Sequence, residues 1–270
     1  MPIITISRGS ASGGLSLAQG LAERLRYELV GREDIIQEAS KFGTSEERLQ
    51  GALLKPVRFW DRFGDERRQY LAFVQEALCE RAKGDRIIYH GNAGHLLLWG
   101  ISHVLCVRLI APLAYRVNVV MQRQQMNRED AVRFIEDRDR QRKSWTRFLY
   151  GVDWLDPSLY DVTINLQTMD VETAVELVAT AAERPEFQPT AESRKAMADL
   201  LVASRVRAAL AAEKTTRSAD VEVRADGDIV YLRGRVRPAS MVDSIIRVVD
   251  SVEGVRHVDR GNLDAPDYTV

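Results

Sequence analysis

The hydrophobic pattern of the chain starts almost at the first residue. Residues 3–7 form a short run rich in β-branched apolar side chains that stops at a glycine-rich turn, which predicts a buried strand. Beyond the turn, apolar residues recur at helical spacing, at Leu17, Ala18, Leu21, Ala22 and Leu25. The chain therefore opens with a strand, a glycine-rich loop and a helix.

Strand and helix patterns then alternate as far as residue 183. Strands are predicted at 86–89, 103–110 and 161–166. Helices are predicted at 70–83, 95–99, 114–126, 128–145 and 170–183. In the mixed, charged segment 32–64 we expect short helices that carry Trp60 and Phe63 toward a cleft. This alternation predicts an α/β fold with a parallel sheet and helices on both faces, and Asp170 is the expected N-cap of the last helix.

A second, smaller pattern follows a polar segment that contains Pro185 and Pro189. Its order is α-β-β-α-β, with elements at about 194–213, 221–224, 229–234, 239–251 and 255–260. The dipeptide Asp226-Gly227 is a strong hairpin signal between the two central strands. We predict a first domain at 1–184, a linker at 185–194 and an α+β domain with a short tail at 195–270. A protease should cut first within 184–194.

Composition narrows the function classes. The chain has 45% hydrophobic and 29% charged residues and a formal net charge of −1, as in an ordinary packed protein. No overall positive field recruits DNA, RNA or an anionic membrane, so any phosphate binding must be local. The start of the sequence has no signal-peptide pattern and no window is long enough to span a membrane, so we expect a cytoplasmic protein.

The glycine-rich turn has the spacing of a Walker A phosphate loop. It reads Gly9, Ser10, Ala11, Ser12, Gly13, Gly14, Leu15 and Ser16. Backbone N–H groups of such a loop point into a concave turn, and the helix that follows adds its positive end. Leu15 occupies the position of the usual lysine. The alternative interpretation is a flexible turn between a strand and a helix.

Several segments of the first domain resemble the cytidylate kinase-like family. They are 4–8 with the 12–14 turn, 107–112 with Arg116, Asp139 with Arg142, 150–154, and 160–165. The resemblance covers most of residues 1–184. It implies a P-loop nucleoside monophosphate kinase fold, with ATP phosphates on the glycine loop and CMP or another nucleoside monophosphate opposite.

The family pattern also implies roles for individual residues. Residues 9–16 together with Arg8 would hold ATP, and Ser16 would coordinate Mg²⁺. Arg116 and Arg142 would neutralise phosphoryl oxygens. Asp139 would face the acceptor or hold an arginine in place. The alternative for arginines on the two long helices is a solvent-exposed face paired with acidic residues.

Two departures weaken the kinase prediction. Leu15 lacks the charge of a P-loop lysine, and Asn92 lies where the family usually has arginine. The predicted function is therefore a nucleotide-binding protein with weak phosphotransferase activity, or alternatively a pseudokinase that senses nucleotides. Arg8, Arg116 or Arg142 could replace the missing charge. His90 and His95 have no acidic or cysteine partners at metal-ligand spacing and are interpreted as structural.

The second domain resembles a BON domain, a module named after osmotic-shock and nodulation proteins. The resemblance rests on residues 206–210, 230–236 and 252–258. It adds a third hypothesis, in which this domain is an interaction module for an unknown protein or lipid partner and the first domain is its scaffold.

Overall fold

The computed structural model of the chain describes residues 1–47, 64–91, 93–236 and 238–264. The expectations for Trp60, Phe63 and Asn92 lie outside these residues. The chain forms two compact units, one of residues 1–34 and 84–190 and one of residues 35–83 and 191–270.

A five-stranded parallel sheet is the centre of the first unit. Its strands are β1 (Ile3–Arg8), β2 (Glu28–Gly31), β3 (Ile87–His90), β4 (Val104–Ile110) and β5 (Val162–Asn165). Their order is β2-β3-β1-β4-β5, and every neighbouring pair is parallel. The α/β prediction is confirmed, whereas the short edge strand β2 was not predicted.

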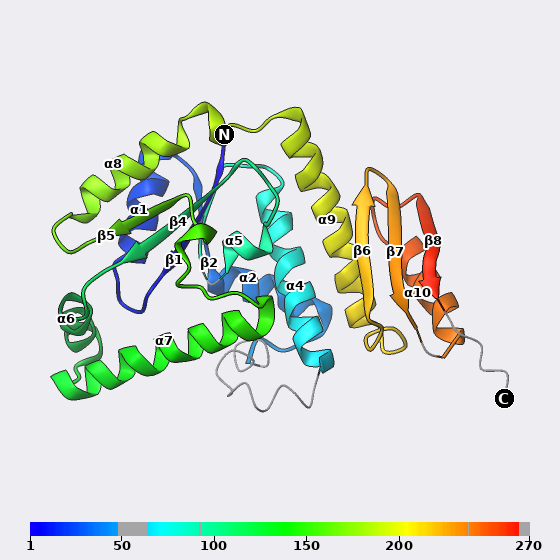
Figure 1. Ribbon diagram of the computed structural model, residues 1–270, viewed down its shortest axis with the longest axis horizontal. Helices are drawn as coiled ribbons and strands as arrows, with labels where there is room; N and C mark the ends of the chain where they lie inside the picture. The colour runs from blue at the N-terminus through cyan, green and yellow to red at the C-terminus, as the bar shows by residue number, and fades with distance from the viewer. Residues whose placement is uncertain (48–63, 92, 237, 265–270) are drawn as a thin grey trace. The chain divides into compact units, whose positions relative to one another are not determined.

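Helices cover both faces of this sheet (Figure 1). Helix α1 (Gly14–Leu25) packs against α8 (Val171–Ala182), and both contribute to the core beneath one face. Helix α7 (Arg128–Tyr150) runs along the opposite side. The other elements are α5 (Gly94–Leu97), α6 (Leu113–Gln124), η3 (Pro157–Leu159) and η4 (Pro185–Phe187). Helix α2 (Arg32–Ala39) begins in this unit and continues into the second one. The core places the loop after β1 at the carboxyl edge of the central strand.

The second unit has the predicted α-β-β-α-β order. It comprises α9 (Ala191–Ala212), β6 (Val221–Asp226), β7 (Ile229–Arg235), α10 (Ser240–Asp250) and β8 (His257–Asp264). β6 and β7 form an antiparallel hairpin whose turn contains Gly227 at φ 63°, as the Asp-Gly signal predicts. β8 is parallel to β7. One face of the sheet, α9 and α10 share an apolar core.

Two elements from the middle of the chain join this second unit: η1 (Ser40–Phe42) and α4 (Gly64–Ala82). Helix α4 packs along α9. Glu80 of α4 accepts a hydrogen bond of 2.7 Å from Nε of Arg205, and Gln69 donates one of 3.1 Å to the Ala211 carbonyl. A segment within the predicted first domain therefore packs on the BON-like fold, and the domain boundaries stay a prediction.

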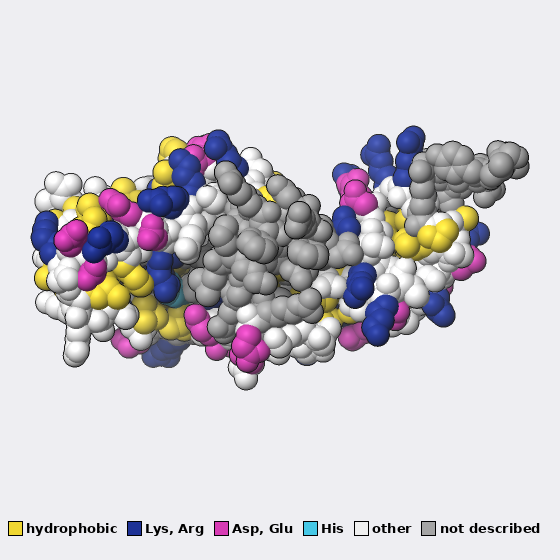
Figure 2. All heavy atoms as spheres, turned by 90° about the horizontal axis from the view of Figure 1, so that it is seen from below, with side chains coloured by type: hydrophobic (Ala, Val, Ile, Leu, Met, Phe, Trp, Pro, Cys, Tyr) yellow, Lys and Arg dark blue, Asp and Glu magenta, His cyan; other side chains and the backbone are white. Residues whose placement is uncertain are grey.

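The exposed charges of the first unit are mixed in sign. Figure 2 shows Lys and Arg side chains beside Asp and Glu side chains on the face that carries α7. Along this helix Arg133 pairs with Asp130 at 2.7 Å and Arg140 pairs with Asp137 at 3.2 Å, which confirms the solvent-exposed interpretation for these two arginines. Among the described residues, no helix is long and apolar enough to cross a membrane.

Candidate functional site

The glycine-rich loop connects the end of β1 to the first turn of α1. Its backbone is tightly curved, with Ala11 at φ 58° and Gly13 at φ 81°. The buried Ser12 hydroxyl donates to the Gly9 carbonyl over 2.9 Å, and the Leu17 N–H closes the first helical turn on the Gly13 carbonyl. The region of positive φ is where glycine carries no steric cost, so Gly13 meets a backbone requirement.

Three predicted site residues hold this loop from outside. Asp139 accepts the Ser10 N–H at 3.0 Å, and Arg116 donates to the Ser10 carbonyl at 2.7 Å while it also pairs with Asp139. Arg142 donates to the Arg8 carbonyl and lies 3.8 Å from Asp139. The structure thus brings Arg116, Asp139 and Arg142 together around the loop. Asp139 holds an arginine, which is one of the two roles that the sequence left open.

The positive charge in this cluster is concentrated and partly desolvated. Burial lowers the pKa of Arg142 to about 10, and the charge of Arg8 acts in the same direction, against the opposing effect of Asp139. Arg142 also lies 5.6 Å from the centre of the Trp154 ring. A guanidinium with this pKa is charged at neutral pH, so Arg116 and Arg142 place positive charge beside the loop, and Asp139 offsets part of it.

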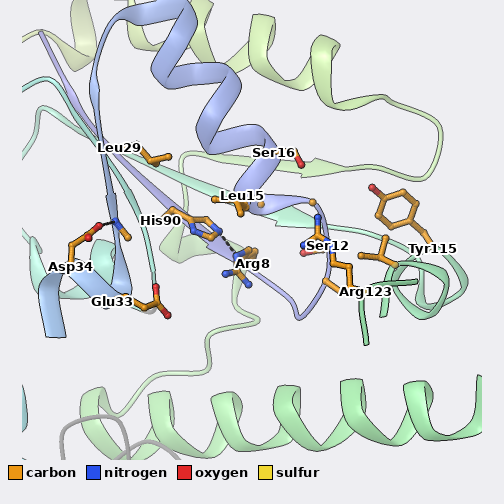
Figure 3. A pocket seen from close by; sticks show the side chains of 15 residues that line it. Arg8, Ser12, Leu15, Ser16, Leu29, Glu33, Asp34, His90, Tyr115 and Arg123 are labelled. Atoms are coloured by element: carbon orange, nitrogen blue, oxygen red, sulfur yellow. Dashed lines mark hydrogen bonds between the residues drawn. The ribbon is translucent and has the colours of Figure 1, made fainter. Parts of the chain in front are cut away.

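A cavity of about 450 Å³ opens beside the loop. It is lined by Arg8, Ala11, Ser12, Gly13, Gly14, Leu15, Ser16, Leu29, Gly31, Glu33, Asp34, His90, Tyr115, Val119 and Arg123. Figure 3 shows the labelled members of this set around the space in front of α1. Leu15 is 42% exposed, and Ser16 is also exposed at the start of the helix. The carboxyl ends of β1, β2 and β3 all contribute, which is where open α/β sheets bind ligands.

Several lining residues were not predicted as site residues. His90 ends β3, the neighbour of β1, and accepts a hydrogen bond from Nε of Arg8. Glu33 and Asp34 lie at the start of α2, and the Asp34 carboxylate accepts the Gly31 N–H at 2.7 Å. One signal in the sequence pointed to His90, because it directly follows a predicted strand at 86–89 and the carboxyl ends of parallel strands share one edge.

His95 lies away from this cavity. Its ring centre is 4.7 Å from that of Tyr160, and burial is the main cause that lowers its pKa to about 4. Within the described ranges no group of three or more His, Cys, Asp or Glu side chains is arranged to hold a metal ion. Of the two histidines interpreted as structural, only His90 lines the candidate site.

Residues 3–168, well over half of the chain, match the family described as the cytidylate kinase-like family. The chain belongs to this family. Residues 198–264 match the BON domain.

Relatives with the name cytidylate kinase cover the same part of the chain. The protein of Methanocaldococcus jannaschii is 23% identical over 67% of this chain and 97% of its own length. That of Pyrococcus horikoshii is 29% identical over 72% of this chain and 94% of its own length. A solved structure of an uncharacterized protein from Eubacterium ventriosum superposes with a TM-score of 0.55 at 18% identity, over 68% of this chain and all of its own, and it supports the fold alone.

Proposed function

We propose that the first unit binds ATP with its phosphates on the loop at 9–16 and transfers the terminal phosphoryl group to a nucleoside monophosphate. The observation that carries this proposal is the loop itself, curved between β1 and α1 and held by Asp139 and Arg116 through Ser10. A backbone fixed in this way presents N–H groups to phosphate without further rearrangement. CMP is the favoured acceptor because the relatives that cover this unit are named cytidylate kinases.

The chemistry asks for charge and position rather than for a strong base. An ionised phosphate oxygen of the acceptor forms a new bond to the γ-phosphorus, while the bond to the bridging oxygen breaks and ADP leaves with the electron pair. Because the attacking oxygen is already largely ionised at neutral pH, no proton must be removed from it. Arg116 and Arg142 are the proposed cations near the reacting phosphates, and Asp139 keeps Arg116 in place.

Mg²⁺ is the metal that such a reaction uses. Ser16 fits its usual protein ligand, since its side chain lies exposed in the first turn of α1 and lines the cavity. Mg²⁺ commonly takes most of its remaining ligands from phosphates and water, so one hydroxyl on the protein suffices. When bound, the ion would neutralise charge on the phosphates. Because ATP and nucleoside monophosphates are cytoplasmic metabolites, the proposed location is the cytoplasm.

A second candidate function is a nucleotide sensor with little or no turnover. Leu15 favours it, because an exposed apolar side chain lines the cavity where a P-loop lysine would contact the transferring group. Loss of one such donor costs about a hundredfold or more in rate. In this alternative, nucleotide binding would be relayed to the BON-like fold and its unknown protein or lipid partner.

One sample distinguishes the two functions. ATP binding is measured by calorimetry, and phosphotransfer to CMP, UMP, AMP and GMP is measured by a coupled assay on the same protein with Mg²⁺. We expect micromolar binding and slow turnover that rises in Leu15→Lys. Turnover in the natural protein like that of ordinary monophosphate kinases would contradict the sensor function, and binding without turnover would support it. A protein that binds no nucleotide would contradict both proposed functions.

A further inference from the structure

The side chain of Arg8 lies beside Gly14, next to the position at which a P-loop usually has its lysine. It is the last residue of β1, and its side chain folds back over the first turn of α1. A Cβ atom added to Gly14 would overlap Cδ of Arg8 and lie 2.9 Å from its Nε. Gly14 directly precedes Leu15. The side chain of Arg8 therefore lies directly over Gly14, the residue before the position at which a P-loop has its lysine.

His90 fixes this position. The Nε–H of Arg8 donates to Nε2 of His90, the contact drawn as a dashed line in Figure 3. His90 is only 7% exposed, and burial, followed by the charges of Arg8 and Arg142, lowers its pKa to about 3. A neutral imidazole can accept one hydrogen bond, which is what the contact requires. His90 thus restrains one edge of the guanidinium.

The other edge of the guanidinium is available. Within the described ranges, neither terminal nitrogen of Arg8 forms a hydrogen bond or a salt bridge. The side chain is half-buried and lines the cavity beside Ser12, Gly13 and Ser16. Burial is the largest cause of the lowered pKa of Arg8. The negative charge of Glu33 raises this pKa, and the positive charges of Arg123 and Arg32 lower it further. A partly desolvated cation without a paired carboxylate is stabilised by an anion.

We propose that Arg8, held by His90, supplies the phosphate-binding charge that Leu15 does not supply. This inference rests on the proposed nucleotide site, and it assigns His90 a positioning role through Arg8. The Arg8 side chain lines the cavity, and its two terminal N–H₂ groups can contact two phosphate oxygens in a planar, bidentate geometry that the ammonium of a lysine does not have. The loop keeps its backbone donors and gains its cation from the strand instead of the helix.

The test uses the full chain and two probes, ATP and inorganic tripolyphosphate, with affinities measured by calorimetry. Arg8→Gln should weaken both probes about ten- to a hundredfold, the usual effect of losing a hydrogen bond to a charged group. His90→Leu should weaken them less, and His90→Gln, whose amide oxygen can accept the Arg8 N–H, should recover most of that loss. Arg133→Gln, an exposed arginine of α7, is the matched control and should change neither affinity.

Two double variants separate charge from structure. Leu15→Lys should restore binding in Arg8→Gln, because it returns a cation to the same phosphates. His90→Leu should add little in the Arg8→Gln background, since it acts through the same guanidinium. If Arg8→Gln lowers the melting temperature, Arg8→Lys keeps the charge without the planar guanidinium and should bind with intermediate affinity.

The outcomes distinguish this inference from the proposed function. If the natural protein binds neither probe, both fail. If it binds both and Arg8→Gln binds equally well, the nucleotide site stands and the role of Arg8 is overturned. Equal losses from His90→Leu in the natural and Arg8→Gln backgrounds would overturn the positioning role of His90.

Discussion

At the scale of residues, the loop shows what a motif predicts and what it leaves out. The apolar run at 3–7 and the helical spacing from Leu17 to Leu25 predicted the strand, loop and helix order that the structure contains. The contact between Arg8 and His90 could not be predicted from the sequence, because it depends on β3 lying directly beside β1. That neighbour relation is set by the order of strands in the sheet, and periodicity along the chain does not reveal it.

Gly13 gives a prediction at this scale. We expect Gly13→Val to abolish ATP binding and to lower the melting temperature, for two reasons. The residue has φ 81°, which costs a β-branched side chain steric strain, and an added Cβ would lie 3.0 Å from Cδ1 of the buried Leu166. Calorimetry and thermal unfolding measure the two effects.

Gly84→Ala is the matched control for this variant. No atom of the described residues lies within 4 Å of a Cβ at Gly84, so both measurements should stay near those of the natural protein. A Gly13→Val protein that binds ATP with unchanged affinity would move the phosphate site away from the loop.

At the scale of elements, long amphipathic patterns were predicted well and short edges were not. Helices α1 and α8 lie close to their predicted bounds, and α7 begins where it was predicted but continues beyond 145 to Tyr150. Strand β2 was missed because Glu28–Gly31 offers only two apolar residues, and its place is fixed by parallel pairing with β3 alone. Four residues are too few for periodicity to separate a strand from a loop.

Helix α8 carries a cap that the sequence predicted, and its stability should depend on pH. Asp170 accepts the Thr173 N–H at 2.8 Å, and this backbone hydrogen bond lowers the pKa of its carboxyl. A depressed pKa in the folded state means that the stabilisation is present above the unfolded pKa and is lost as the pH falls through the folded value. We therefore expect Asp170→Ala to lower the melting temperature by a few degrees at pH 7 and by less in acid.

Asp170→Asn is the informative control. An asparagine keeps an oxygen that can accept the Thr173 N–H but does not titrate, so most of the stability should remain and this pH dependence should disappear. A fall for Asp170→Ala that is equal at pH 7 and in acid would contradict an ionised cap.

At the scale of the whole molecule, the sequence predicted two folds but not how the chain is shared between them. The small α-β-β-α-β fold follows the predicted order, and its hairpin lies at the predicted Asp-Gly turn. Helix α4 nevertheless packs on α9, although more than a hundred residues separate them in sequence. Both helices have apolar faces, and the pattern of apolar positions in a sequence does not predict which distant helix packs against each face.

The packing of α4 on α9 adds an expectation to the proposal that 1–184 and 195–270 are separate domains. Protease should cut first within 184–194, and the irregular residues 188–190, between η4 and α9, are the expected site. The two fragments should then stay associated under native conditions, because α4 remains on one and α9 on the other. Size-exclusion chromatography of the nicked protein, before and after mild denaturant, measures this association.

A matched pair of arginines tests the reason for the association. Arg205 has 19% of its side chain exposed and pairs with Glu80 of α4, whereas Arg256 is 81% exposed and pairs with Asp228 inside the BON-like fold. Arg205→Gln removes the largely buried ion pair between α9 and α4 and leaves Glu80 with Lys83 alone, so the nicked fragments should separate at lower denaturant than they do in Arg256→Gln. Exposed pairs contribute little, so Arg256→Gln should match the natural protein. Fragments that separate at once in native buffer would show that α4 and α9 do not hold together, and a first cut within 195–262 would overturn the boundary itself.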